Sequence, residues 1–178
     1  RDFLYNALTV IQSLCRSDPA QAEEATVQFA NYLRGNMDAL QTNAPIPFAR
    51  ELEHTREYLA LEQMRFEDKL NVRYDIPCQS FTLPILTLQP IVENAVVHGL
   101  RASNKPIHIS VTTRKTDTDY LIVVEDDGTG FKSSDNNEPH IALNNIRERL
   151  EMMCKGKLTI SQREGGGTSM RITLPNEN

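Results

Sequence analysis

The chain has 178 residues, of which 39% are hydrophobic and 24% charged, with a formal net charge of −5. This composition is typical of a globular protein, and an acidic chain without a dense Lys/Arg run argues against nucleic acid as the main partner. No apolar run reaches the ~18 residues of a membrane span, and the N-terminus lacks a signal-peptide pattern. We therefore expect a globular protein with neither nucleic acid nor a membrane span of its own.

The first part of the chain predicts helices. Apolar residues recur at helical spacing over three segments, residues 2–16, 20–40 and 48–66. Ser17 or Asp18 is a candidate N-cap for the second helix, since Pro19 suits a first helical position. Charges fill one face of the third helix, which is typical of a solvated surface. Because helical periodicity is present from the first residues, we expect the chain to be part of a longer protein.

The pattern of apolar and polar residues changes after residue 66 and predicts a unit of mixed helices and strands. Strands are expected over residues 70–76, 107–114, 120–126, 157–164 and 168–175. Helices are expected over residues 84–100 and 140–153. The polar loop 127–139 has a length typical of functional loops, and we expect a lid over roughly residues 127–141 to be mobile without a ligand and to close over its phosphates. The chain thus divides into residues 1–66 and 67–178, in the α+β class.

The helix predicted over residues 84–100 contains an unusual run, LQPIVENAVVHGL. Most of it is apolar, yet Glu93, Asn94 and His98 lie inside it, and buried polar groups cost free energy unless they have partners. His98 near the helix end is compatible with a plain C-terminal cap in which Gly99 adopts the left-handed conformation. The alternative is that the polar side chains face a ligand while the apolar ones face the sheet.

Nucleotide chemistry accounts for these residues together with a later turn. Asn94 offers an amide oxygen of the kind that Mg²⁺ accepts, and Glu93 beside it suits an acid–base role. Asp126, at the end of a predicted strand, can accept a hydrogen bond from the exocyclic amine of adenine. Gly128 and Gly130 would let the backbone approach a ligand closely. Taken alone, the turn that contains Gly128 and Gly130 is also compatible with an ordinary strand end. Likewise, GGGT at residues 165–168 is compatible with an ordinary hairpin.

The order of these motifs resembles a known superfamily. LQPIVENAVVHG resembles the N-box of the GHKL ATPases, VEDDGTGF their first glycine box, and GGGT their last. HIALNNIRERLEMM resembles the segment that joins the lid to a helix. DFLYNALTVIQSL, NYLRGNMD and ELEHTREYLALEQMRFEDKL are similar to the dimerisation and phosphotransfer region of LytS/YesM-type sensor histidine kinases. The resemblance covers nearly the whole chain and implies a two-layer α/β sandwich over residues 67–178.

The resemblance also implies roles for individual residues. It implies that Asn94 coordinates Mg²⁺, that Glu93 is the neighbouring catalytic acidic residue and that Asp126 binds adenine. The other positions that it implies for ATP binding are His98, Gly128, Gly130, Ala142, Gly165, Gly167 and Thr168. It further implies a cytoplasmic bacterial kinase core beneath a membrane sensor that lies upstream. The implied partners are a response regulator and a second copy of the chain in a parallel homodimer through the N-terminal helices.

Three positions depart from the family pattern. Asp2 occupies the place of the phosphoacceptor histidine, and a carboxylate cannot form the phosphoramidate of such relays. Val97 stands where a lysine is common, and Ala142 where a glycine is common. We therefore expect impaired autophosphorylation. Two explanations stay open, a natural pseudokinase that signals by ATP-dependent conformation and a kinase in which these residues were replaced.

The remaining histidines are poor substitutes for an acceptor. His54 lies on the charged helix face and His108 in a predicted strand, and we expect both, like His140, to be ordinary surface imidazoles. A GHKL ATPase of the chaperone, gyrase or mismatch-repair kind is a third function class. The helical segments before residue 67 argue against it, because their arrangement is that of the kinase family.

Overall fold

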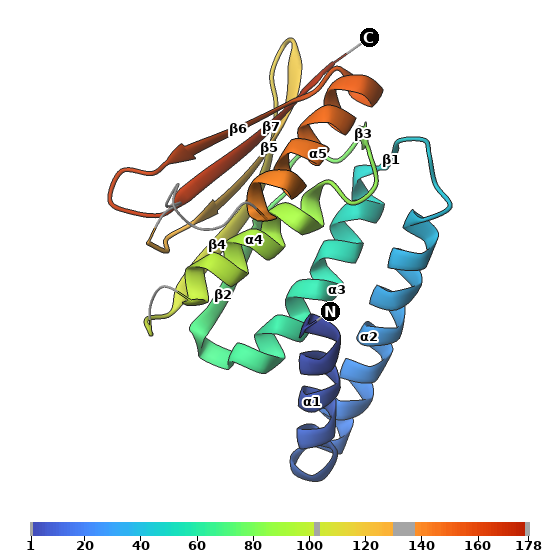
Figure 1. Cartoon of the computed structure of the whole chain (residues 1–178), viewed down its shortest axis with the longest axis vertical. Helices are drawn as coiled ribbons and strands as arrows, with labels where there is room; N and C mark the ends of the chain where they lie inside the picture. Colours follow the sequence, from blue (N-terminus) through green and yellow to red (C-terminus); the bar gives the residue numbers. More distant parts are fainter. Residues whose placement is uncertain (1, 102–103, 130–137, 177–178) are drawn as a thin grey trace.

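The computed structural model describes residues 2–101, 104–129 and 138–176 (Figure 1). The helices are α1 (Asp2–Ser17), α2 (Pro19–Ala39), α3 (Phe48–Phe66), α4 (Leu88–Arg101) and α5 (Glu138–Cys154), with a 3-10 turn at Glu67–Lys69. The strands are β1 (Ile46–Pro47), β2 (Leu70–Asp75), β3 (Thr82–Leu83), β4 (Ile107–Lys115), β5 (Asp119–Asp126), β6 (Lys157–Gln162) and β7 (Thr168–Pro175). The predicted α+β class is confirmed.

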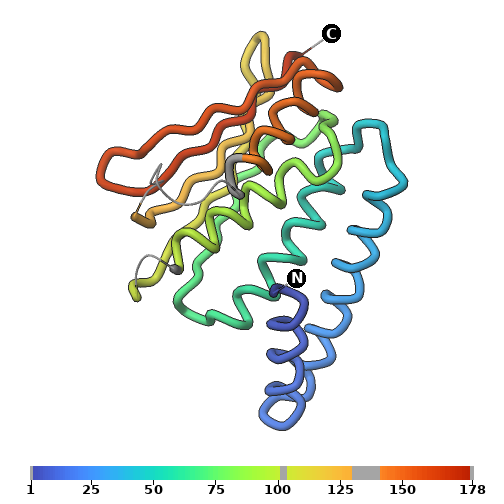
Figure 2. Tube along the Cα trace, viewed as in Figure 1, coloured from blue at the N-terminus to red at the C-terminus, as the bar shows by residue number. Residues whose placement is uncertain are grey.

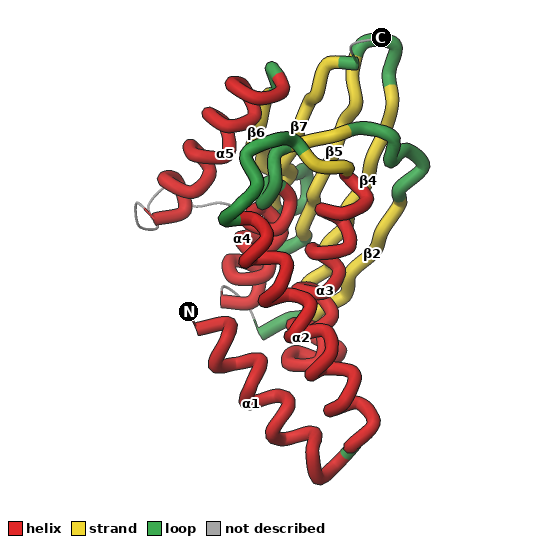
Figure 3. The backbone as a smooth tube through the Cα atoms, turned by 90° about the vertical axis from the view of Figure 1, so that its right-hand side faces the viewer, coloured by secondary structure: helices red, strands yellow, loops and turns green. Residues whose placement is uncertain are grey.

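The first two helices meet in a tight turn, and α2 then runs beside α3 (Figures 1 and 3). The side chain of Asp18 accepts a hydrogen bond from the backbone N–H of Gln21 at 3.0 Å, which identifies Asp18 as the N-cap of α2. The ring of Phe3 lies 4.8 Å from that of Tyr32 and 5.0 Å from that of Tyr58, between centroids. The start of α1 is therefore anchored to both α2 and α3.

A five-stranded sheet in the order β2-β4-β5-β7-β6 forms the second layer. The pair β2–β4 is parallel and the other pairs are antiparallel. Helices α4 and α5 cover one face (Figures 1 and 3). Every second residue of β4, namely Ile107, Ile109 and Val111, is buried, as a half-covered strand requires. Helices over one face of a mixed sheet form the expected two-layer sandwich.

Helix α3 packs against α1 and α2 on one side and against α4 and β2 on the other. The traces in Figures 1 and 2 place it between these two groups of elements. Its buried residues share one hydrophobic cluster with those of α4 and the strands. The α3 members of this cluster are Phe48, Leu52, Tyr58, Leu59 and Leu61. The division at residue 67 therefore falls where α3 ends, although the core is continuous across it, and it stays a prediction.

The prediction of a solvated charged face on α3 holds only in part: Arg50, Glu53 and Arg56 are exposed, whereas other polar residues of the helix are buried. Glu51 is 1% exposed, Glu62 4% and His54 9%. The ring of His54 stacks on Tyr32 with centroids 5.4 Å apart, and its Nε2 lies 3.2 Å from Oδ1 of Asn36. A central helix is covered on several sides, so charged positions as well as apolar ones are buried. His54 is thus not a surface imidazole, whereas His108 is exposed.

All the predicted helices and strands are present, but the sequence pattern missed two short strands. Residues 46–47 and 82–83 form an antiparallel pair, β1–β3, which is too short for alternation to be recognised. The helix expected from residue 84 begins at Leu88. The intervening residues 84–87 instead form a buried or half-buried turn, whose backbone is held by side chains from other helices.

Candidate nucleotide-binding site

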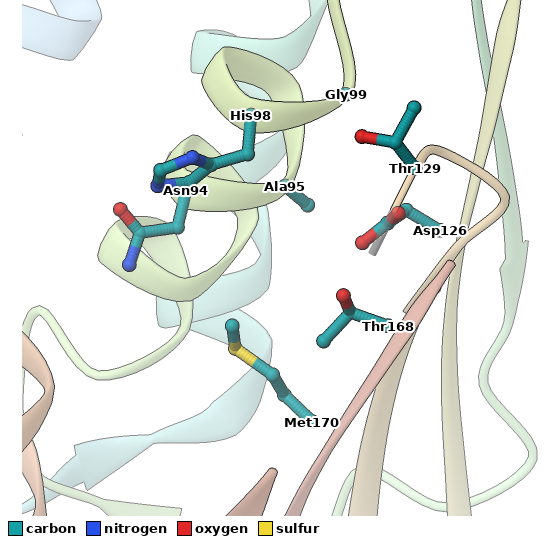
Figure 4. A pocket seen from close by; sticks show the side chains of 8 residues that line it. All are labelled: Asn94, Ala95, His98, Gly99, Asp126, Thr129, Thr168 and Met170. Atoms are coloured by element: carbon teal, nitrogen blue, oxygen red, sulfur yellow. The ribbon is translucent and has the colours of Figure 1, made fainter. Parts of the chain in front are cut away.

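An open pocket lies between α4 and the adjoining ends of β5 and β7 (Figure 4). The residues that line it are Asn94, Ala95, His98 and Gly99 from α4, and Asp126, Thr129, Thr168 and Met170 from the sheet side. Figure 4 shows Asn94 and His98 side by side on α4, with their side chains pointing away from Asp126 in this view, and Ala95 on the side of the helix that faces Asp126, Thr129 and Thr168. The pocket thus brings together Asn94, His98, Asp126 and Thr168, which the sequence predicted as binding residues.

Asp126 is the carboxylate among the residues that line the pocket, and it is 7% exposed. Its Oδ1 accepts a hydrogen bond from the backbone N–H of Gly128 at 3.0 Å, and the backbone N–H of Thr168 donates to the same carboxylate. Burial raises the pKa of Asp126, and these hydrogen bonds oppose that rise. A carboxylate held by backbone donors at a pocket wall is a fixed acceptor for a ligand N–H.

The two glycine turns both contact Asp126. A Cβ on Gly167, where φ is +97°, would collide with the backbone oxygen of Asp126. A Cβ on Gly128 would lie 3.1 Å from Oδ1 of Asp126 and 3.1 Å from Cα of Gly99. Hence GGGT is a hairpin turn, as one interpretation held. Its last glycine also lets the start of β7 approach the end of β5, which carries Asp126. Close approach as well as the positive φ requires glycine at position 167, and at position 128 a side chain would make tight contacts.

Arg163, which the sequence analysis missed, ties the β6–β7 hairpin to the end of β5. Its Nη1 donates to the backbone oxygen of Asp126 at 3.0 Å, and its Nε lies 2.7 Å from Oε2 of Glu125. An Arg just before a glycine turn carries no local signal of this role, because the partners come from a distant strand. Arg163 therefore supports the backbone that presents Asp126.

Glu93 does not line the pocket. It lies one position from Asn94, which is about 100° around a helix, so it faces the N-terminal helices instead. Burial raises the pKa of Glu93, and its charge contributes to the raised pKa values of Glu62 and Tyr58. Four residues earlier, on the same side of α4, Nε2 of Gln89 donates to Oη of Tyr32 at 3.1 Å. The interpretation that all polar residues of this helix face the ligand thus does not hold for Glu93.

The other predicted site residues lie elsewhere. Asp2 is exposed in the first turn of α1, and Ala142 is exposed in α5. Gly165 has φ +85° and open space around it. Gly130, with most of the predicted mobile loop, lies outside the described residues. Helix α4 continues to Arg101, so Gly99 is not the left-handed cap that was one alternative; its missing side chain instead admits Ile107, 2.7 Å from where a Cβ would be.

The pocket's donor set fits a nucleotide–metal complex better than a bare metal. Among the described residues, no group of three or more His, Cys, Asp or Glu side chains could hold a metal ion. Mg²⁺ typically takes one or two protein oxygens and completes its shell with water and phosphate oxygens. Asn94 offers one such oxygen on the pocket wall. Mg²⁺ at this site would therefore depend on the phosphates that it accompanies.

Solved structures share this fold. The histidine kinase domain of the Erythrobacter litoralis EL346 blue-light activated histidine kinase aligns with a TM-score of 0.58 at 16% identity, over 98% of this chain and 95% of that domain. The catalytic domain of histidine kinase ThkA aligns with a TM-score of 0.56 at 15% identity, over 74% of this chain and 94% of that one. The fold is thus that of histidine kinase catalytic domains.

Family models match both parts of the chain. The model described as "Histidine kinase" matches residues 1–70, and the "Histidine kinase-, DNA gyrase B-, and HSP90-like ATPase" model matches residues 84–178. The chain belongs to the histidine kinase family and carries this ATPase domain. The kinase match over the first helices also argues against the chaperone, gyrase or mismatch-repair class, as the sequence analysis expected.

Curated relatives agree with this assignment. YwpD of Bacillus subtilis is 38% identical over 97% of this chain and 65% of its own length. Sensor protein LytS of Oceanobacillus iheyensis is 31% identical over 99% of this chain, and sensor histidine kinase YpdA of Escherichia coli 33% over 98%. The chain spans 33% of that LytS and 32% of YpdA. Within the described residues, no helix has the length and apolar character needed to cross a membrane.

Proposed function

We propose that this chain is the cytoplasmic catalytic core of a bacterial two-component sensor histidine kinase that binds ATP with Mg²⁺. The observation that carries the proposal is the pocket in which Asn94 and His98 of α4 lie across from Asp126 and Thr168. Residues 67–178 form the ATP-binding unit and residues 1–66 the dimerisation and phosphotransfer unit. A membrane sensor joined upstream of residue 1 would supply the signal, and a response regulator would receive the phosphoryl group.

Each pocket residue has a specific task in this proposal. Asp126 accepts the hydrogen bond of the adenine amino group, because its carboxylate is buried and already oriented by two backbone N–H donors. The amide oxygen of Asn94 coordinates Mg²⁺, and His98 and Thr168 bind the nucleotide beside these anchors. Bound Mg²⁺ would offset the phosphate charge during transfer. The phosphates of the nucleotide are bound more weakly than its adenine, because Val97 brings no positive charge to them.

Glu93 acts on the acceptor side of the site rather than on the nucleotide side. Its charge influences Tyr32 and Tyr58, and the ring of Phe3 packs on these same tyrosines. Glu93 therefore faces the start of α1, where the acceptor position, Asp2, lies. A carboxylate there is suited to orient an attacking group or to take its proton.

Phosphoryl transfer itself is impaired in this chain. Asp2 is a carboxylate at the place where the family has an imidazole, and its negative charge repels the γ-phosphate. His54 cannot replace it, because its ring is stacked on Tyr32 and buried. The alternative function, a pseudokinase that signals through ATP-dependent conformation and dimerisation, is favoured by this one substitution.

The N-terminal helices present the surface for a parallel homodimer. Among the apolar residues at helical spacing in α1 and α2, Phe3, Ile11 and Phe29 pack against the chain's own core. The exposed large hydrophobic residues of α1 and α2 are Leu4, Tyr5, Leu8, Val27, Leu33 and Met37. Exposed apolar side chains on two adjacent helices favour an interface, and the occupant that we propose is a second copy of the same two helices.

Calorimetric titration with ATP and Mg²⁺ tests the nucleotide proposal. Asp126→Asn replaces one acceptor oxygen by a donor and should weaken binding by about 1–3 kcal/mol. Asp119→Asn, the same change at the opposite end of β5, is the matched control and should leave affinity unchanged. Asn94→Ala should remove the contribution of Mg²⁺ while leaving metal-free binding intact. Equal affinities for the parent, Asp126→Asn and Asp119→Asn would refute the assignment.

A further inference from the structure

The backbone just before α4 is capped by a side chain from another helix. The carboxylate of Glu51, on α3, accepts hydrogen bonds from the backbone N–H groups of Leu86 (3.1 Å), Thr87 (2.9 Å) and Leu88 (3.1 Å). The first N–H groups of a helix have no acceptor within it, and a negative charge at that end is favourable. Glu51 thus serves α4 as a remote N-cap from a fully buried position.

The same segment is held from α5 through its carbonyl groups. Nη1 of Arg149 donates to the backbone oxygen of Ile85, and Nη2 donates to that of Leu86, both at 2.7 Å. Leu86 therefore gives its N–H to a carboxylate and its carbonyl to a guanidinium. One residue joins α3, α5 and the start of α4.

Leu86 also has an unusual backbone conformation. Its φ is +55°, in the left-handed region that β- and γ-branched L side chains rarely adopt. The other non-glycine residues with positive φ in the described chain are Glu67 and Lys155. Lys155 follows the last residue of α5, where a left-handed residue is common, and Glu67 follows the last residue of α3 with φ 52° and ψ −126°. Leu86 precedes a helix instead, and a strained residue persists where its surroundings over-determine it.

We propose that Glu51 and Arg149 are positioning residues for the nucleotide site, which they serve by fixing the start of α4. This inference rests on the proposed function for the identity of the ligand. Helix α4 is stiff and carries Asn94 and His98 into the pocket, so its starting position sets where these side chains lie. Because Glu51 belongs to α3, the same contact fixes the pocket relative to the phosphotransfer helices.

Two substitutions probe the two halves of this contact. Glu51→Gln keeps the shape but turns amide hydrogens toward backbone N–H donors, so at least one hydrogen bond is lost. Arg149→Met keeps the stem and removes both donors, whereas Arg149→Lys keeps the charge but cannot form the two-pronged contact. Leu61→Ala is the control: it lies on α3 and is buried, and it destabilises the core without removing a partner of Leu86.

The first measurement is affinity for MgADP at a temperature where every variant is folded. Glu51→Gln and Arg149→Met should each weaken binding about tenfold, the effect of one lost buried hydrogen bond. Arg149→Lys should fall between parent and Arg149→Met. The affinity of the double variant should lie within about twofold of that of the weaker-binding single variant, because both changes release the same segment. Leu61→Ala should bind within about twofold of the parent.

The second measurement separates this inference from the proposed function. The side-chain amide signals of Asn94 and the ring signals of His98 are followed by NMR without nucleotide. They should shift in Glu51→Gln and Arg149→Met but not in Leu61→Ala. A parent that does not bind MgADP defeats the proposed function, yet these shifts would still support the positioning role. Unshifted signals, or an affinity loss in Leu61→Ala equal to that in Glu51→Gln, would overturn it. Should Glu51→Gln not fold, the two Arg149 variants carry the test.

Discussion

The buried carboxylate of Glu62 should make the stability of the protein depend on pH. It is 4% exposed on α3, and Nη1 of Arg65 approaches its Oε1 only to 3.9 Å. Burial, together with the charge of Glu93, raises the pKa of Glu62 from 4.5 to about 7 against the opposing influence of Arg65. The folded protein therefore keeps this proton over a pH range in which the unfolded chain has released it.

The sign and size of the effect follow from proton linkage. Between pH 4.5 and about 7 the folded state binds the extra proton, so the free energy of unfolding falls as pH rises through this window. Each pKa unit corresponds to about 1.4 kcal/mol, which gives a loss of about 3 kcal/mol across the window. Glu62→Gln resembles the protonated acid and has no such loss. We expect the variant to be more stable than the parent by less than about 1 kcal/mol at pH 5 and by about 3 kcal/mol at pH 8.

Urea unfolding at pH 5, 6, 7 and 8 measures this difference. Glu23→Gln, at an exposed position of α2, is the control, and its effect should stay within about 0.5 kcal/mol at every pH. Glu93→Gln should narrow the pH range over which the parent loses stability, because it removes a negative charge that raises the pKa of Glu62. A Glu62→Gln difference that does not change from pH 5 to pH 8 would show that Glu62 is ionised in the folded state, and the reasoning would fail.

Two further predictions concern assembly and transfer. In light scattering, Leu8→Glu should convert a dimer into a monomer, because Leu8 on α1 is 52% exposed. Met152→Glu on α5 is the control and should leave the dimer intact. A parent protein that is monomeric at high micromolar concentration would contradict this prediction. With radiolabelled ATP, the parent should acquire no acid-labile label. Asp2→His should give slow labelling, and Asp2→His with Val97→Lys and Ala142→Gly should restore most of it; robust acid-labile label on the parent would refute the argument.

Periodicity predicted the helices and strands because each lies against one apolar core. It also contained a signal that was not used: Glu51 and Glu62 share the helical spacing of Thr55 and Tyr58, which are buried. Glu53, two residues after Glu51, is exposed. The charge run alone therefore predicted a solvated face, whereas the spacing places two of its carboxylates on the covered side.

Candidate site residues were predictable where the chemistry lies within a short motif. Asn94 and His98 are four residues apart and lie on the same side of α4, and both line the pocket with Asp126. Arg163 and Arg149 could not be found in this way, since each contacts the backbone of a segment far along the chain. Only the three-dimensional arrangement identifies such partners.

The polar residues of α4 are compatible with its apolar run because the helix has three different surroundings. Asn94 lies at the pocket, Ile91 and Val92 lie in the core, and Glu93 lies toward the N-terminal helices, where its charge raises the pKa of Glu62. A rigid helix with two polar faces transmits any displacement of one face to the other. A carboxylate at position 2, the proposed acceptor position, leaves this mechanical connection in place. A chain that binds ATP without transferring phosphate therefore retains a physical route between the nucleotide pocket and the dimerisation helices, as the pseudokinase alternative requires.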